Sequence, residues 1–154
     1  MVSVGKRVAN FTLPATGDKT LSLEDFRGQN LVIWFYPKDN TPGCTREGQD
    51  FRDAYADFQA ADTEILGVSR DSVRSHENFC TKQSFPFDLL SDADETLCRR
   101  FDVIREKSLY GRKYMGIERS TFLIDAAGVL RHEWRKVRVP GHVESVLQAV
   151  RNLD

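Results

Sequence analysis

Residues 31–48, LVIWFYPKDNTPGCTREG, join an apolar run to a short polar turn that contains one cysteine. The apolar run from Leu31 to Tyr36 is typical of a buried strand. Thr41 is a favourable helix N-cap residue, and Pro42 suits the first helical position, where a missing backbone N–H costs nothing. The stretch therefore predicts a strand, a turn and a helix, with Cys44 in the first helical turn.

In that first turn the sulfur of Cys44 would lie beside free backbone N–H groups and the positive end of the helix dipole, which favours the nucleophilic thiolate. Raising the thiolate fraction of an ordinary cysteine from about 3% to about 90% at pH 7 requires about 3.4 kcal/mol. A helix dipole supplies about 0.3–1 kcal/mol, and up to about 2 in partly buried sites. The helix start therefore falls short, and we expect a fixed cation near the sulfur.

The composition of the 154 residues, 40% hydrophobic and 29% charged, predicts one soluble globular domain over residues 1–154. A net charge of −1 gives no reason to expect binding to nucleic acid or to an anionic membrane. There is no apolar stretch of about 18 residues, and residues 1–7 lack the apolar core of a signal peptide, so we expect a cytoplasmic protein. Three widely spaced cysteines argue against a secreted disulfide framework.

Helical and strand patterns alternate through the middle of the chain. Apolar residues recur at helical spacing over about residues 43–60, beginning with Phe51, Ala54, Tyr55 and Phe58. Further helices are expected over 72–83, from an acidic first turn at 91–95, and at the end of the chain, where Val143, Val146, Leu147 and Val150 recur. Strands are expected over 64–69, 86–90, 120–125 and 129–134.

The two remaining regions have weaker patterns. Residues 1–30 predict a short strand or hairpin followed by one helical turn, and residues 105–118 predict a basic loop punctuated by glycines. The whole pattern predicts an α/β fold with three layers, in which helices cover both faces of a central mixed sheet.

Several histidines and cysteines have plain structural interpretations. His132 and His142 are expected to be surface or capping residues, and Cys98 a packing residue or an incidental surface thiol. His76 and Cys80 have the i, i+4 spacing of a metal-ligand pair, but no second pair with close spacing accompanies them, which argues against a metal site. The sequence also lacks a glycine-rich phosphate loop and a dinucleotide fingerprint.

The segment YPKDNTPGCTREG, at residues 36–48, resembles the peroxidatic motif of peroxiredoxins, Pro-x-x-x-Thr-x-x-Cys. Together with GVSRDS at 67–72, SHENF at 75–79 and ERSTFLID at 118–125, it is similar to the bacterioferritin-comigratory-protein (PrxQ) subfamily. The resemblance runs from about residue 5 to Leu147. It implies a thioredoxin-like fold and a thiol peroxidase that reduces hydrogen peroxide and organic hydroperoxides.

The resemblance also implies roles for particular residues. Cys44 would be the peroxidatic cysteine, Thr41 its hydroxyl partner, and Pro37 the residue that shields the pocket. Arg119 would supply the guanidinium beside the sulfur, and Glu47 would help to hold it. Attack of a thiolate on a peroxide oxygen needs no metal or organic cofactor, so none is expected.

The resolving cysteine is the point at which this sequence departs from many relatives. Many members of the subfamily place it five residues after the peroxidatic cysteine, where this chain has Gln49. Another subset places it on the next helix, and Cys80, 36 residues after Cys44 (80 − 44), matches that arrangement. A disulfide needs Cα atoms within about 7 Å, so local unwinding around 40–48 and 76–84 is expected during turnover.

The resemblance further implies a monomer whose disulfide is reduced by thioredoxin or a similar dithiol, and the basic residues of 105–118 could contribute to docking that donor. Three alternatives remain. The protein could be a one-cysteine peroxidase with Cys80 structural, or a redox-sensing holdase or interaction module. It could also be a general thiol–disulfide oxidoreductase, although that class would have a cysteine where this chain has Thr41.

Overall fold

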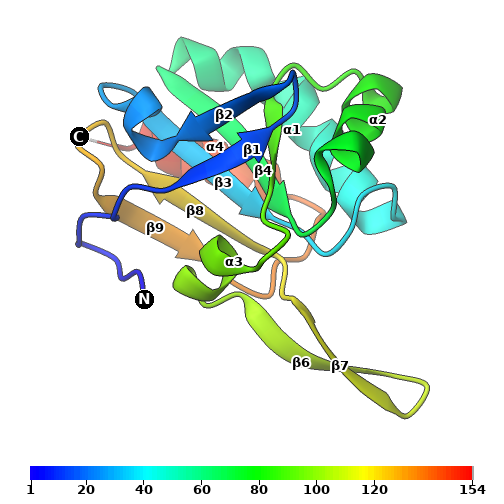
Figure 1. Cartoon of the computed structure of the whole chain (residues 1–154). Coiled ribbons are helices and arrows are strands. Elements are labelled where there is room, and N and C mark those ends of the chain that lie inside the picture. Colours follow the sequence, from blue (N-terminus) through cyan, green and yellow to red (C-terminus); the bar gives the residue numbers. More distant parts are fainter. Residues whose placement is uncertain (154) are drawn as a thin grey trace.

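A central sheet and four α-helices make up most of the computed structural model, which describes residues 1–153 (Figure 1). The strands of the central sheet are β1 (Thr12–Ala15), β2 (Lys19–Ser22), β3 (Asn30–Phe35), β4 (Thr63–Ser69), β5 (Asp88–Ser91), β8 (Ser120–Ile124) and β9 (Leu130–Trp134). Their order is β2-β1-β5-β4-β3-β8-β9. Strands β3, β4 and β5 are mutually parallel, whereas β1 pairs antiparallel with β5 and β8 pairs antiparallel with β3. The sheet is therefore mixed, as the sequence predicts.

The helices are α1 (Pro42–Ala60), α2 (Val73–Gln83), α3 (Thr96–Arg100) and α4 (His142–Arg151), and a short 3-10 helix, η1 (Leu23–Phe26), follows the β1–β2 hairpin. These elements match the predicted helices and the predicted hairpin with its single helical turn, apart from small shifts at their ends and from α3. That helix begins at Thr96, after the acidic residues 91–95 that were expected to form its first turn. Within residues 1–153, none of the helices has both the length and the apolar character needed to cross a bilayer.

Strand β3 divides the interior into two cores because its side chains alternate between the faces of the sheet. Its odd-numbered apolar residues, Leu31, Ile33 and Phe35, join a core on one face that also contains residues of α3. Its even-numbered residues Val32 and Trp34 join a core on the other face, which contains residues of α1, α2 and α4. Helices therefore cover both faces, with the three longest on the same side.

Residues 105–118, predicted as a loop, instead form most of a hairpin of β6 (Ile104–Leu109) and β7 (Arg112–Ile117). The two residues between the strands, Tyr110 and Gly111, both have positive φ, 51° and 79°, as in the two-residue turns that suit β-hairpins. The outer part of this hairpin, residues 108–115, is exposed and projects from the body (Figure 1). It therefore lacks the alternation of apolar and polar residues by which a half-buried strand is recognised.

Candidate active site

Cys44 is the third residue of α1, which begins just beyond the end of β3. The intervening turn reverses at Asn40, whose φ of 62° lies in the left-handed region that asparagine tolerates better than most residues. The thiol of Cys44 is buried. The strand, turn and helix predicted from residues 31–48 thus bring the sulfur to the first turn of α1.

Arg119 reaches this sulfur from the connection between β7 and β8. Because β8 pairs antiparallel with β3, the residues that precede β8 lie next to the end of β3 and the start of α1. Nη2 of Arg119 donates a hydrogen bond to Sγ of Cys44 over 3.5 Å. A Cβ at position 43 would lie 3.0 Å from that same Nη2, so Gly43 leaves the guanidinium room to approach.

Glu47, one turn into α1, holds the other side of the guanidinium. Nη1 of Arg119 donates to Oε1 of Glu47 over 2.7 Å. Burial lowers the pKa of Arg119, but the charges of Glu47 and Cys44 outweigh it and leave that pKa above its usual value. Arg119 is therefore a permanent cation, the kind of group that the energetics of a reactive thiol require.

The second oxygen of Glu47 is unusual. Oε2 is buried and has no hydrogen-bond partner among residues 1–153. Burial raises the pKa of Glu47 to about 7, although Arg119 acts in the opposite direction. The nearest ring nitrogen is Nε2 of His142, 3.8 Å from Oε2.

His142 was predicted to be a surface or capping residue, and the structure contradicts this. Its ring is buried, and Nε2 lies 2.7 Å from Oγ1 of Thr121 on β8. Burial, followed by the charge of Arg119, lowers the pKa of His142 to about 4, so the ring is neutral at ordinary pH. Positions 142, 146 and 150 share one face of α4 through their i, i+4 spacing, and this signal in the sequence could have placed His142 inside.

Thr41 and Pro37 lie in the turn before α1. Thr41 occupies the N-cap position, but its side chain caps no N–H of the helix within the described chain. Its hydroxyl instead donates to the carbonyl oxygen of Lys38 over 2.7 Å, which leaves the oxygen lone pairs free to accept a hydrogen bond. Pro37 is half-buried. Thr41 therefore occupies the predicted N-cap position, but its side chain bonds Lys38 and not the helix.

The three cysteines are free thiols in this conformation. Cys80 lies in α2, half-buried, with Sγ 3.8 Å from the carbonyl oxygen of Phe87. Burial, followed by the negative charge of Asp88, raises the pKa of Cys80 to about 12. Cys98 is buried in the core beside α3, and burial raises its thiol pKa as well. Neither residue is a ready nucleophile as the chain is folded here.

A buried cluster of hydrogen bonds ties the turn before Cys44 to the start of α2. The carboxylate of Asp39 accepts from the hydroxyl of Tyr36 over 2.6 Å, from that of Ser75 over 2.8 Å, and lies 2.8 Å from Nδ1 of His76. The backbone N–H of Asp39 donates to Asp71, the residue before the N-cap of α2. Both ring nitrogens of His76 have partners, since Nε2 lies 2.9 Å from the carbonyl oxygen of Leu90.

Asp39, Asp71 and His76 bring three ligand-type atoms within 4.8 Å of one another. The carboxylate oxygens of this group already accept hydrogen bonds. Oδ2 of Asp71, for example, accepts one from the hydroxyl of Ser69 and one from the backbone N–H of Asp39. The group acts as a structural bridge between two segments of the chain.

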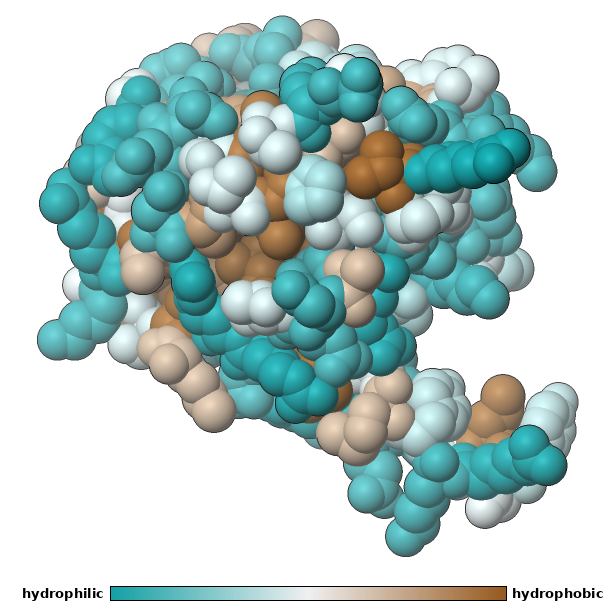
Figure 2. Space-filling view, viewed as in Figure 1, coloured by the Kyte–Doolittle hydropathy of each residue, from teal (hydrophilic) through white to brown (hydrophobic). Residues whose placement is uncertain are grey.

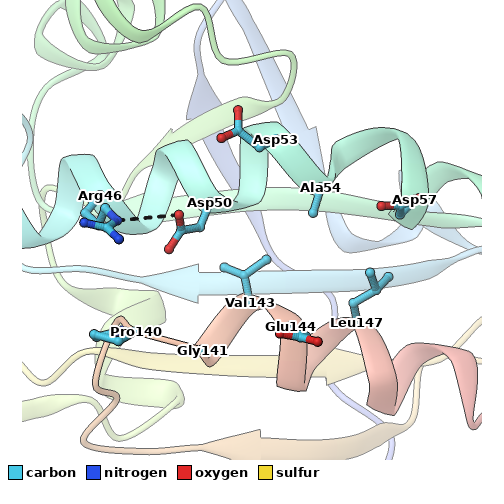
Figure 3. A pocket seen from close by; sticks show the side chains of 10 residues that line it. All are labelled: Arg46, Asp50, Asp53, Ala54, Asp57, Pro140, Gly141, Val143, Glu144 and Leu147. Atoms are coloured by element: carbon cyan, nitrogen blue, oxygen red, sulfur yellow. Dashed lines mark ion pairs between the residues drawn. The ribbon is translucent and has the colours of Figure 1, made fainter.

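A groove of about 500 Å³ lies between α1 and α4 (Figure 3). Val143 and Leu147 of α4 point toward α1 across it, and acidic side chains border it, among them Asp50 and Glu144 (Figure 3). Cys44, Thr41 and Arg119 do not line this groove. The chemistry therefore belongs to the turn before α1, and the groove is an acidic surface feature.

Comparisons with known proteins place the chain in a family. The model of the AhpC/TSA family matches residues 4–133. The peroxiredoxin Bcp of Xanthomonas campestris pv. campestris is 54% identical over 145 residues, 93% of this chain and 91% of the relative. A solved structure of peroxiredoxin Q from X. campestris has a TM-score of 0.88 at 54% identity and covers 92% of this chain and 89% of its own.

A PrxQ from Xylella fastidiosa, solved as a Cys→Ser mutant, has a TM-score of 0.93 at 45% identity and covers 98% of this chain and 96% of its own. Two further structures of X. campestris peroxiredoxin Q carry serine at one or the other of two cysteines that are 36 residues apart. With these matches to the chain and its fold, the protein belongs to the AhpC/TSA family and is a peroxiredoxin of the Bcp/PrxQ group, a thiol peroxidase with a thioredoxin-like fold.

Proposed function

We propose that Cys44 is the peroxidatic cysteine and that it reduces hydrogen peroxide and organic hydroperoxides. The thiolate sulfur attacks the terminal peroxide oxygen, an S–O bond forms, and the O–O bond breaks. The other oxygen leaves as hydroxide or alkoxide and takes a proton from water, while Cys44 becomes a sulfenic acid. The observation that carries this proposal is the 3.5 Å approach of Nη2 of the Arg119 guanidinium to the sulfur.

A high thiolate fraction alone does not give fast peroxide reduction, because the nucleophilicity of a thiolate falls as its basicity falls. Stabilisation of the charge that develops on the leaving oxygen is usually the larger contribution. Arg119 and the backbone N–H groups at the start of α1 are the donors for that charge. Thr41 accepts the O–H of the hydroperoxide with its free lone pairs, while Pro37 shields the turn from water.

The second step of the proposal uses Cys80. Its thiolate attacks the sulfur of the sulfenic acid, a disulfide forms, and the displaced hydroxide takes a proton to become water. The cysteines replaced by serine in X. campestris peroxiredoxin Q have the same spacing as Cys44 and Cys80. Because burial raises the pKa of Cys80 to about 12, the thiol must leave its site before it can react. We therefore propose unwinding around 40–48 and 76–84 during each turnover.

A dithiol protein such as thioredoxin then reduces the disulfide and completes the cycle. Its thiolate attacks one sulfur to form a mixed disulfide, and its second thiol displaces the peroxidase, leaving the donor oxidised. We propose that the enzyme works as a monomer in the cytoplasm. A structure of the X. campestris bacterioferritin comigratory protein comes from a study of its alkyl peroxide reduction activity, with a trapped intermediate and ligand complexes. This activity of a relative supports organic hydroperoxides as substrates of the present chain.

The test is a set of single substitutions with one equivalent of peroxide. Cys44→Ser should abolish peroxide consumption, whereas Cys80→Ser should consume one equivalent and stop at the sulfenic acid. Cys98→Ser is the matched control and should behave like the wild type. Peptide mapping without reductant should find Cys44 joined to Cys80. Full activity in Cys44→Ser would refute the proposal, and wild-type turnover in Cys80→Ser would favour a one-cysteine mechanism.

A further inference from the structure

The β6–β7 hairpin carries most of the exposed large apolar side chains of the described chain. Four of the six found among residues 1–153 lie on it: Leu109, Tyr110, Tyr114 and Met115. Their exposed fractions range from 47% to 97%. In the space-filling view the hairpin projects from the body with apolar and strongly hydrophilic side chains next to one another (Figure 2). Exposed apolar groups concentrated in this way mark a surface that binds something.

The strand register divides the hairpin into two faces. Lys107 pairs with Tyr114, and Leu109 pairs with Arg112, so these four side chains point to the same side. A Cβ on Gly116 would lie 3.2 Å from both the Lys107 and the Tyr114 side chains, which confirms that these two share a face. We call this set, with Arg105, the basic face of the hairpin. It consists of Arg105, Lys107, Leu109, Arg112 and Tyr114, and no acidic side chain of the described hairpin belongs to it.

The basic face begins at the active site. Lys107, at the inner end of this face, is half-buried. Burial and the charge of Arg119 lower its pKa, whereas the charge of Cys44 raises it. The hairpin leads directly into Arg119, two residues after β7 ends. From Lys107 outward, the face continues to Tyr114, Leu109 and Arg112 at the exposed end.

We propose that the basic face of the hairpin docks the protein dithiol that reduces the oxidised enzyme, and that this donor presents an acidic and apolar surface around its reactive cysteine. The inference rests on the proposed function. The donor thiolate must touch a sulfur in the Cys44 region, so the surface around that thiolate must contact whatever borders this region. The basic face is such a border.

Charge complementarity selects the occupant. The acidic groove between α1 and α4, which Cys44 does not line, would repel an anionic partner, whereas the basic face attracts it and raises its association rate. A second copy of the chain, docked face to face, would bring Arg112 and Lys107 against their own equivalents. Tyrosine and arginine are among the residue types enriched at protein interfaces, and the basic face supplies both in Tyr114 and Arg112.

The experiment compares two charge reversals that lie next to each other on opposite faces. Arg112→Glu changes the basic face, and the matched control Lys113→Glu makes the same change on the other face. Peroxidase turnover is measured with thioredoxin as donor and, separately, with dithiothreitol, which needs no docking surface. Arg112→Glu should raise the KM for thioredoxin about tenfold, with a weaker salt dependence. Lys113→Glu should change it less than twofold, and all rates with dithiothreitol should stay at the wild-type level.

Equal effects of the two reversals, or equal losses with both reductants, would overturn the docking assignment. So would a concentration-dependent dimer in sedimentation that Arg112→Glu dissociates, because it would assign the face to a second copy. Failure of the proposed function is visible separately. In that case the wild-type enzyme would not turn over peroxide even with dithiothreitol.

Discussion

Nη1 of Arg119 lies 2.7 Å from Oε1 of the buried Glu47, across a separation of 72 residues in the chain. The side chain of Arg119 is only 17% exposed, and Nη2 of its guanidinium contacts the sulfur of Cys44. Holding the long arginine side chain in one conformation costs conformational entropy. Because Glu47 already orients the guanidinium in the folded protein, this cost is not added to the barrier of the reaction. Glu47 is in this sense a positioning residue for Arg119.

The first prediction concerns the cation itself. Arg119→Ala should lower kcat/KM for hydrogen peroxide about 10²–10³-fold, the usual cost of removing a donor to developing charge. Arg119→Lys should recover only part of this loss, because an ammonium cannot bridge Cys44 and Glu47 with the fork geometry of a guanidinium. Stopped-flow measurement of the oxidation rate checks both. Arg46 is an exposed arginine of α1, the helix that contains Cys44, so Arg46→Ala is the control and should have wild-type rates.

The second prediction is a pH dependence of stability that comes from Glu47. Its pKa is about 7 in the folded protein and about 4.5 in the unfolded chain, so folding takes up a proton between these values. Stability from this group is therefore complete below about pH 4.5 and is lost as the pH rises through 7, by up to about 1.4 kcal/mol per pH unit. Denaturant titrations at pH 5, 6, 7 and 8 should show that the free energy of unfolding of Glu47→Gln rises relative to that of the wild type as the pH rises. A constant difference between the two would contradict the raised pKa.

His142 predicts a slope of the opposite sign. Its pKa falls from 6.5 to about 4 on folding, so between these pH values the imidazole is protonated in the unfolded chain and neutral in the folded protein. Stability should therefore fall as the pH drops from 6.5 toward 4. His142→Gln removes this titration and keeps a partner for Thr121, so it should gain on the wild type at pH 5 relative to pH 8, in the same denaturant titrations. A variant that loses stability equally at both values would show that the ring has only a packing role.

The local part of the site could be predicted from the sequence. The apolar run of β3, Pro42 and the spacing of Cys44 from Thr41 act over a few residues, and they fix the strand, the turn and the helix start. The need for a cation followed from an energy balance, although only the family resemblance pointed to Arg119. These predictions rest on short-range patterns or on a motif.

The tertiary part could not be predicted in this way. The orphaned oxygen of Glu47 and its neighbour His142 meet only because α1 packs against α4, and no local pattern encodes that contact. The cluster around Asp39 likewise depends on the parallel pairing of β3 with β4. The β6–β7 hairpin was missed for the opposite reason, since a strand that is exposed on both faces needs no apolar alternation.

The next prediction concerns that cluster. Asp39→Asn leaves a buried imidazole and two hydroxyl groups with a weaker acceptor, which should cost about 1–3 kcal/mol of unfolding free energy. Hydrogen exchange should become faster in the turn before α1 and at the start of α2, the two segments that the carboxylate joins. Asp53→Asn, at an exposed position of α1, is the control. Unchanged exchange in Asp39→Asn would show that packing alone holds the two segments together.

The last prediction concerns a second link, which joins α1 to the end of α2 that is farther from Asp39. Nε2 of Gln49 donates to Oε1 of Gln83, and Nη1 of Arg52 donates to the backbone carbonyl of Gln83, both over 2.9 Å. Cys80 lies between this link and the buried cluster around Asp39. The partly exposed Gln83 end should release first when α2 unwinds, because its hydrogen bonds can be replaced by water.

Gln49→Ala removes one of these bonds, worth about 1 kcal/mol, and should speed disulfide formation after peroxide attack about fivefold. The rate of attack itself should stay within twofold, since Gln49 does not touch the sulfur. Rapid quenching with a thiol-alkylating reagent, followed by peptide mapping, separates the two steps. Lys82→Ala, an exposed neighbour on α2, should leave both rates unchanged. An unaltered or slower disulfide step in Gln49→Ala would mean that α2 does not open from this end.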